Sequence, residues 1–327
     1  MDSNKPIVAP KPPSLTKSLM AGFDAIGNHV GIILFSICLD VFLWFGPRLR
    51  ILEVSQPLLS KTSQFPELQN KETFEAFQTV LGDINLFSIL RTFPVGIPSL
   101  MAGRPSSTMP IGKPLIWELP SFSITLFVWV LILLFGLILG SLYFNVVAQA
   151  AILGKVNMSQ AIDDWFWDFL QVFLLALVYL LLCVVLFIPF SCIFTIIMMS
   201  GIGLEQLSLI FFLIAGIFLI WLMIPIFFSP HGIFVNRRKM WFSLLDSFRL
   251  TRLTFSTTGL LLIILLVISE GLNILWNMPP EDSWLTLIGI AGHAFISASL
   301  LATSFIYYRD ALSWIQQMLH QPQLTTA

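Results

Sequence analysis

The stretch FLQVFLLALVYLLLCVVLFIPFSCIFTIIM, residues 169–198, decides the fold. Its 30 residues include no Asp, Glu, Lys, Arg or His. The hydrocarbon core of a bilayer is about 30 Å thick and takes about 20 apolar helical residues to cross. The apolar residues are continuous rather than alternating, which favours a helix over a barrel strand. At 1.5 Å per residue this helix would measure about 45 Å, so we expect it to tilt, to kink near Pro189 or to project beyond the membrane.

Five further runs have the length and composition of a membrane span. The chain of 327 residues is 57% hydrophobic and 11% charged, with a mean hydropathy of +0.88, whereas soluble domains carry about 25% charged residues. The predicted fold class is therefore all-α: a polytopic transmembrane helical bundle of about six spans in three hairpins, with interfacial amphipathic helices. The predicted spans are 30–46, 123–142, 169–198, 207–228, 257–276 and 285–307.

The regions outside the spans define the predicted domains. Residues 1–14 contain four prolines and are expected to be a disordered cytoplasmic tail. The six-span membrane domain follows over 15–315, and a second cytoplasmic tail covers 316–327. A long outer segment, 47–120, joins spans one and two. Its apolar residues from 74 onward recur at helical spacing, so we expect it either to lie in the outer interface or to pack onto the ends of the spans.

The distribution of basic residues predicts the orientation. The segments assigned to the inner face carry ten lysines and arginines, and the two short outer loops carry none. This asymmetry predicts that both termini are cytoplasmic. The outer segment 47–120 carries seven basic residues, and Arg48 and Arg50 near the membrane count against this orientation, although long segments are translocated largely regardless of charge.

A weak internal repeat supports the three hairpins. The pattern AIxDxF at 161–166 returns as SLxDxF at 243–248, and residues 21–26 have a similar character. Each copy precedes a predicted span. Each hairpin is therefore expected to be entered through a short amphipathic helix at the inner face.

Three ionisable side chains lie inside predicted spans: Asp40, Glu270 and His293. Such groups cost about 2.5–3.5 kcal/mol each at the bilayer centre on insertion scales and are functional candidates by default. All three are expected in the outer half of the bilayer, where they could form one intramembrane polar cluster. That cluster would either fix helix register through hydrogen bonds, bind an ion or relay protons, or carry out hydrolysis.

Small residues predict close packing in two spans. Gly136 and Gly140 form a G-x-x-x-G pair in the second span, and Ala294, Ala298 and Ala302 follow one face of the sixth. Packing within the bundle is preferred to dimerisation.

A basic cluster lies between spans four and five beside Trp241 and Phe242. It is predicted to anchor an amphipathic helix at the inner face, with docking of anionic lipid headgroups or another membrane protein as the alternative. Its members are Arg237, Arg238, Lys239, Arg249 and Arg252.

Neither a cofactor nor a metal is predicted. Cys38, Cys183 and Cys192 lie in apolar runs without C-x-x-C spacing. No P-loop, G-x-G-x-x-G, H-E-x-x-H or G-x-S-x-G motif occurs. A net charge of −1 argues against nucleic acid as a partner, and leaves the lipid bilayer as the expected one.

The segment SPHGIFVNRRKMWFSLLDSFRLTR, 229–252, and the SFIYYRDAL end of the sixth span resemble a known family. They are similar to the membrane domain fused to some glycerophosphodiester phosphodiesterases and to related stand-alone bacterial membrane proteins of unknown function. The matching residues are Ser243, Ser247, Phe248, Leu250, Arg252, Tyr307, Tyr308 and Asp310. The resemblance covers about residues 120 to 315 and implies a six-span bundle in a bacterial inner membrane, with no catalytic residue to carry over. No stretch here fits the β/α barrel of the soluble phosphodiesterase domain.

Three functional hypotheses follow. The first is a non-enzymatic scaffold, accessory or regulatory membrane component. The second is a transporter-like protein that moves a small solute or lipid past Asp40, Glu270 and His293. The third is an intramembrane enzyme.

Overall fold

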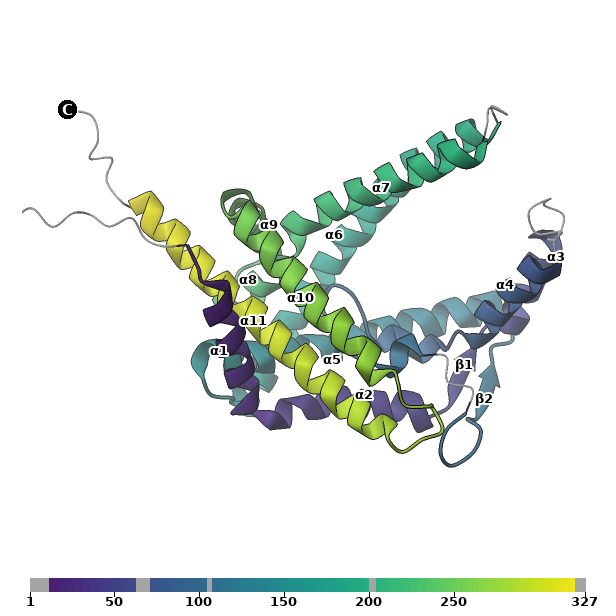
Figure 1. The fold of residues 1–327 in the computed structure, drawn as a ribbon, viewed down its shortest axis with the longest axis horizontal. Coiled ribbons are helices and arrows are strands. Elements are labelled where there is room, and N and C mark those ends of the chain that lie inside the picture. The colour runs from purple at the N-terminus through teal and green to yellow at the C-terminus, as the bar shows by residue number, and fades with distance from the viewer. Residues whose placement is uncertain (1–11, 63–70, 105–107, 200–203, 321–327) are drawn as a thin grey trace, which may run out of the picture.

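A computed structural model of the chain describes residues 12–62, 71–104, 108–199 and 204–320. The fold is all-α apart from two three-residue strands, as predicted (Figure 1). Within these ranges five helical segments are long and apolar enough to cross a membrane, or six if one bent helix pair counts as a single span. The five are α5 (Phe122–Leu153), α6 (Met158–Met199), α7 (Leu204–Ile226) with α8 (Ser229–Asn236), α10 (Phe255–Trp276) and α11 (Thr286–His320).

The bent pair supplies the first predicted span. Helix α1 (Leu15–Gly27) turns by 86° into the short helix η1 (Val30–Ile33) and α2 (Leu34–Phe45). Helix α1 packs along α11, where Gly22 lies against the backbone of Ser299 and against Thr303, leaving no room for a side chain. It is the expected amphipathic helix before the first hairpin.

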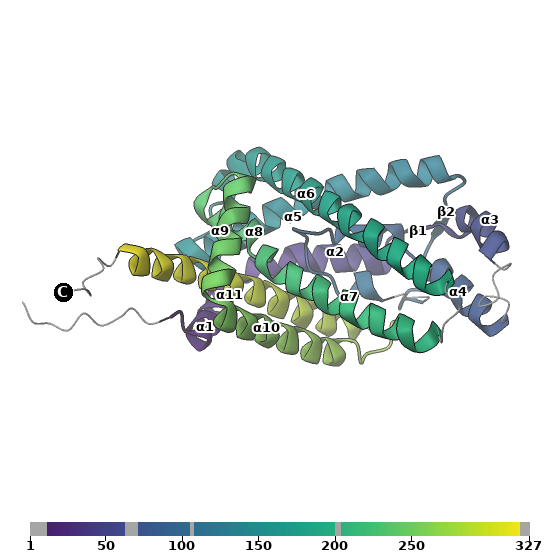
Figure 2. The same cartoon turned by 90° about the horizontal axis from the view of Figure 1, so that it is seen from above.

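The bundle has two distinct ends, which both views show (Figures 1 and 2). One end, called the α9 end here, holds α1, α8 and α9 (Met240–Leu253). The other, the strand end, holds α3 (Leu52–Thr62), α4 (Lys71–Asp83) and the parallel strands β1 (Arg48–Arg50) and β2 (Ile116–Glu118). Arg48 pairs with Ile116 and Arg50 with Glu118. The helix expected from the apolar spacing after residue 74 is present as α4.

Helices α6 and α7 form a hairpin that diverges from α10 and α11 toward its tip (Figure 1). Helix α6 has 42 residues and contains Pro189 without a break in the helix. At 1.5 Å per residue it measures about 63 Å, so it projects well beyond a bilayer core. The expected amphipathic helix before this hairpin is not a separate element, because the helix that begins at Met158 continues into the apolar run without a break.

Helix α11 is also longer than predicted. It continues to His320 and includes the first five residues, 316–320, of the expected C-terminal tail.

Part of the long outer segment enters the bundle. Residues 86–103, called the re-entrant segment here, include η3 (Leu86–Leu90) and η4 (Met101–Gly103). The side chains of Val95, Ile97 and Leu100 are buried in the main hydrophobic core. The segment thus forms part of the bundle interior, whereas the sequence predicted that it would lie in the outer interface or pack onto the ends of the spans.

The G-x-x-x-G pair of α5 faces this re-entrant segment. A Cβ atom at Gly136 would lie 2.9 Å from the carbonyl oxygen of Leu90, and one at Gly140 2.5 Å from that of Val95. The two glycines therefore admit the backbone of a non-helical segment, whereas the sequence suggested a second helix. The alanines of α11, Ala294, Ala298 and Ala302, are all fully buried.

Candidate functional site

Asp40 lies fully buried in α2 and binds the re-entrant segment. Its carboxylate accepts a hydrogen bond of 2.5 Å from the Ser99 hydroxyl, one of 2.9 Å from the Met101 amide and one of 3.2 Å from the Leu100 amide. Ser99 in turn accepts from the amide of Ala102 at 3.0 Å. The carboxylate therefore caps the start of η4 and holds that turn against the first span.

Arg91 of the re-entrant segment interacts electrostatically with Asp40 and with His293. Its guanidinium donates to the Ser99 carbonyl oxygen at 3.4 Å. The His293 ring is partly buried, with Nε2 3.4 Å from the Ser297 hydroxyl, and within the described part of the chain its Nδ1 has no hydrogen-bond partner. Two of the three predicted cluster residues thus lie near one arginine.

Glu270 is not part of this arrangement. Its side chain is exposed on α10, on the same apolar face as Ile263, Val267 and Ile274. Within the described ranges no hydrogen bond or ion pair joins it to Asp40 or His293. The direction of Glu270 around the helix axis therefore separates it from the other two residues of the predicted cluster.

The basic cluster divides into two groups. The Arg237 guanidinium lies 2.8 Å from the Asp164 carboxylate and 5.7 Å from the centre of the Trp167 ring, and Arg238 lies 3.6 Å from Asp246. Asp164 and Asp246 are equivalent positions of the internal repeat, so two successive arginines join the two repeat copies.

The other three basic residues, Lys239, Arg249 and Arg252, are exposed, and the described part of the chain gives them no ion pair. They share the outer surface of α9 with Trp241 and Phe242. This mixture of aromatic and basic side chains suits a helix lying in a membrane interface.

The residues behind the family resemblance form a buried joint at the α9 end. The Ser247 hydroxyl donates to the Pro225 carbonyl at 2.6 Å, and the Ser243 hydroxyl donates to the Ser229 carbonyl. Both carbonyls lie where α7 gives way to α8. Leu250, Tyr307 and Tyr308 share one buried cluster beside this joint, whereas Phe248, Arg252 and Asp310 are not buried.

A second buried carboxylate was missed by sequence analysis. Asp168 of α6 accepts a hydrogen bond from the Asn145 amide group, and Asn145 accepts one from Gln149 at 2.8 Å. Gln149 also accepts from the amide of Asn157 at 2.7 Å. The network joins the end of α5 to the start of α6. Asp168 directly precedes the apolar run that begins at residue 169, where the sequence alone does not distinguish an interfacial aspartate from a buried one.

The geometry defines a class: a multi-span helical membrane protein that contacts the lipid bilayer. Among the described residues no group of three or more His, Cys, Asp and Glu side chains is placed to hold a metal ion. No family model, no curated protein and no solved structure matches the chain.

The Asp40 contacts predict a stability difference between two intramembrane carboxyl groups. Asp40→Ala leaves the amides of Leu100 and Met101 buried without an acceptor, at about 1–3 kcal/mol each. We expect the free energy of unfolding to fall by about 3 kcal/mol or more. Glu270→Ala changes an exposed residue and should alter stability by less than about 0.5 kcal/mol. Thermal unfolding in detergent, followed by tryptophan fluorescence, measures both, and equal melting temperatures would contradict the role of Asp40.

Proposed function

We propose that the chain is a non-enzymatic scaffold, accessory or regulatory protein that binds another membrane protein through the α6–α7 hairpin. The supporting observation is that this hairpin diverges from α10 and α11 (Figure 1), although α6 also packs against α5. Helix α7 packs chiefly against α6 and α9. The hairpin exposes large apolar side chains such as Phe187, Ile188 and Leu219.

A groove between α6 and α7 gives this surface its shape. It measures about 770 Å³ and is lined by apolar residues from both helices, with the small residues Ala215 and Gly216 on the α7 side. A Cβ atom at Gly216 would meet open space. Lipid tails are as apolar as leucine, so helix association in a bilayer depends on close approach over small residues. The expected occupant is a transmembrane helix of the partner protein.

Transport and intramembrane catalysis have less support. Both hypotheses need Asp40, Glu270 and His293 to act on one substrate, and the exposed position of Glu270 separates it from the other two. The Asp40 carboxylate oxygens are occupied by three hydrogen bonds to the re-entrant segment. A transport path would therefore have to displace that segment.

We further infer that the α9 end faces the cytoplasm of a bacterium, with both termini inside. The ten-to-zero distribution of basic residues between the inner segments and the short outer loops supports this orientation. The exposed Lys239, Arg249 and Arg252 would then meet the anionic inner leaflet, where each contributes about 1 kcal/mol of attraction. The resemblance to the membrane domain of glycerophosphodiester phosphodiesterases agrees with this placement.

Single-cysteine labelling tests the orientation. The three native cysteines are replaced by serine, and an impermeant maleimide is applied to intact cells that carry Arg249→Cys or Asp282→Cys. We expect the cysteine at position 282 to react at once and that at position 249 only after lysis. Reaction at 249 before lysis would overturn the proposed orientation.

Site-specific photo-cross-linking tests the binding surface. A photoreactive amino acid replaces Phe187 of α6, which lines the groove and is 71% exposed, or Ile263 on α10, which is 59% exposed. In native membranes position 187 should give a discrete protein adduct and position 263 adducts with lipid alone. Adding Gly216→Ile should abolish the protein adduct, because the side chain fills the groove. Lipid adducts alone at both positions, or a protein adduct unaffected by Gly216→Ile, would contradict the proposal.

A further inference from the structure

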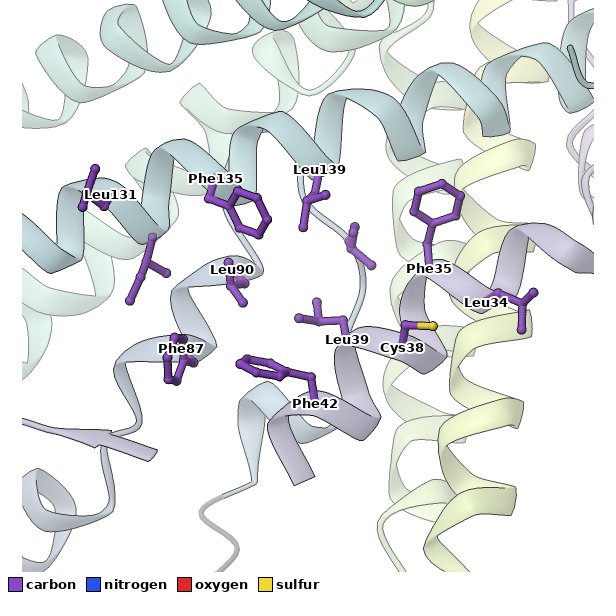
Figure 3. A pocket seen from close by; sticks show the side chains of 12 residues that line it. Leu34, Phe35, Cys38, Leu39, Phe42, Phe87, Leu90, Leu131, Phe135 and Leu139 are labelled. Atoms are coloured by element: carbon purple, nitrogen blue, oxygen red, sulfur yellow. The ribbon is translucent and has the colours of Figure 1, made fainter. Parts of the chain in front are cut away.

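An apolar groove lies between α2, η3 and α5 (Figure 3). It measures about 660 Å³, within the usual range for ligand sites of about 300–1,000 Å³. Side chains from all three elements point into it, among them Leu39 of α2, Leu90 of η3 and Phe135 of α5. The only polar atom among the lining side chains is the sulfur of Cys38. A polar ligand would find no hydrogen-bond partner there, so the groove suits hydrocarbon.

The groove is fixed at the strand end and open at the side. Phe42 of α2 and Phe87 of η3 meet edge to face at 5.2 Å. The Asn85 side chain accepts hydrogen bonds from the backbone amides of Leu49 and Phe87, both 3.2 Å long, and so holds η3 to β1. Two lining residues of α5, Leu131 and Phe135, are half exposed on the outer surface of that helix. The groove is therefore continuous with the surface that faces lipid.

A polar pocket of about 320 Å³ lies next along the chain toward the strand end. Its lining includes Leu43 and Ser88, which directly follow the two phenylalanines of the groove, together with Arg48, Asp83 and Arg104. The pocket is thus lined from α2 and η3 one residue beyond the two phenylalanines, and its charged side chains come from β1, α4 and the residue after η4.

Charges of both signs lie around this pocket. The Nε atom of Arg104 lies 3.9 Å from the Glu281 carboxylate, and Arg48 is repelled by Arg50 and attracted by Glu281 and Asp83. Guanidinium groups and a carboxylate therefore both line the pocket. Arg104 also donates to the Pro279 carbonyl at 2.8 Å, while its Nη1 is buried and has no acceptor within the described residues. An acceptor such as a phosphate oxygen would satisfy that group, and a headgroup that carries both a phosphate and an ammonium suits a pocket lined by both arginine and aspartate.

We propose that the groove and the pocket together bind one zwitterionic phospholipid of the phosphatidylethanolamine class, from the leaflet at the strand end. One acyl chain lies in the groove, the phosphate lies by Arg48 and Arg104, and the ammonium group lies by Asp83. The lengths agree: from Leu34 to Phe42 the groove follows α2 for about 12 Å at 1.5 Å per residue, close to the thickness of one leaflet, about 15 Å. This site is independent of the α6–α7 surface.

Native mass spectrometry of the delipidated full-length protein tests the groove. The protein is loaded with phosphatidylethanolamine, and bound lipid is compared for Leu131→Trp and Leu126→Trp. Both leucines lie on α5 and are 48% and 49% exposed, but only Leu131 lines the groove. Leu131→Trp should weaken retention about tenfold, because each methylene group that loses apolar contact weakens binding severalfold. Leu126→Trp should match the wild type. Equal retention by the two variants, or retention of detergent or fatty acid without phospholipid, would overturn the proposal.

A second comparison tests the headgroup pocket. The wild type should retain phosphatidylethanolamine in preference to phosphatidylglycerol. Asp83→Asn removes the group assigned to the ammonium and leaves a net positive pocket, so the preference should reverse toward phosphatidylglycerol. An unchanged preference in Asp83→Asn, or no preference in the wild type, would contradict the assignment of the pocket. Thermal unfolding of each variant serves as the check that the fold is retained.

Discussion

Three hydrogen bonds join the Asp40 carboxylate to Ser99, Leu100 and Met101, in a region where water is not available to replace them. Non-helical backbone is tolerated at membrane depth only where it is buried in protein or lines an aqueous cavity. The re-entrant segment meets the first condition because the carboxylate accepts from two of its amides and its apolar side chains join the main core. The packing of the strand end therefore depends on this one side chain.

Several other features follow from the position of the re-entrant segment. The glycines of α5 are needed because the carbonyl groups of Leu90 and Val95 lie against them. One wall of the lipid groove is η3, which belongs to the same segment. At the opposite end the spans are joined by different contacts, namely the serine hydroxyls of α9 and the ion pairs of Arg237 and Arg238. The α6–α7 hairpin extends from that second joint. Helix α6 meets the re-entrant segment where the Tyr179 ring stacks on Phe93 at 5.2 Å, and the part of the hairpin beyond that contact carries the proposed binding groove.

Hydrophobic run length predicted the spans because hydrocarbon thickness sets a minimum helix length. The cost of burying charge drew attention to Asp40, but the sequence could not identify its hydrogen-bond partners. Ser99 lies in a proline-rich stretch without periodicity. The other two partners are backbone amides, which every residue except proline has. Glu270 shows a second limit, since depth along a helix does not give direction around its axis. Asp168 shows a third limit, because an aspartate beside an apolar run can be interfacial or buried. It is buried here because the Asn145 side chain of α5 donates a hydrogen bond to it.

Backbone hydrogen–deuterium exchange tests the central claim most directly. In the purified protein the amides within residues 95–101, where Pro98 has none, should exchange as slowly as those in the buried part of α11, because most of these residues are buried and the amides of Leu100 and Met101 donate to Asp40. The exposed turn around Ile111 and Lys113, in the same outer segment, should exchange quickly. If residues 95–101 exchange as fast as that turn, the segment does not enter the bundle, and Asp40 does not hold it there.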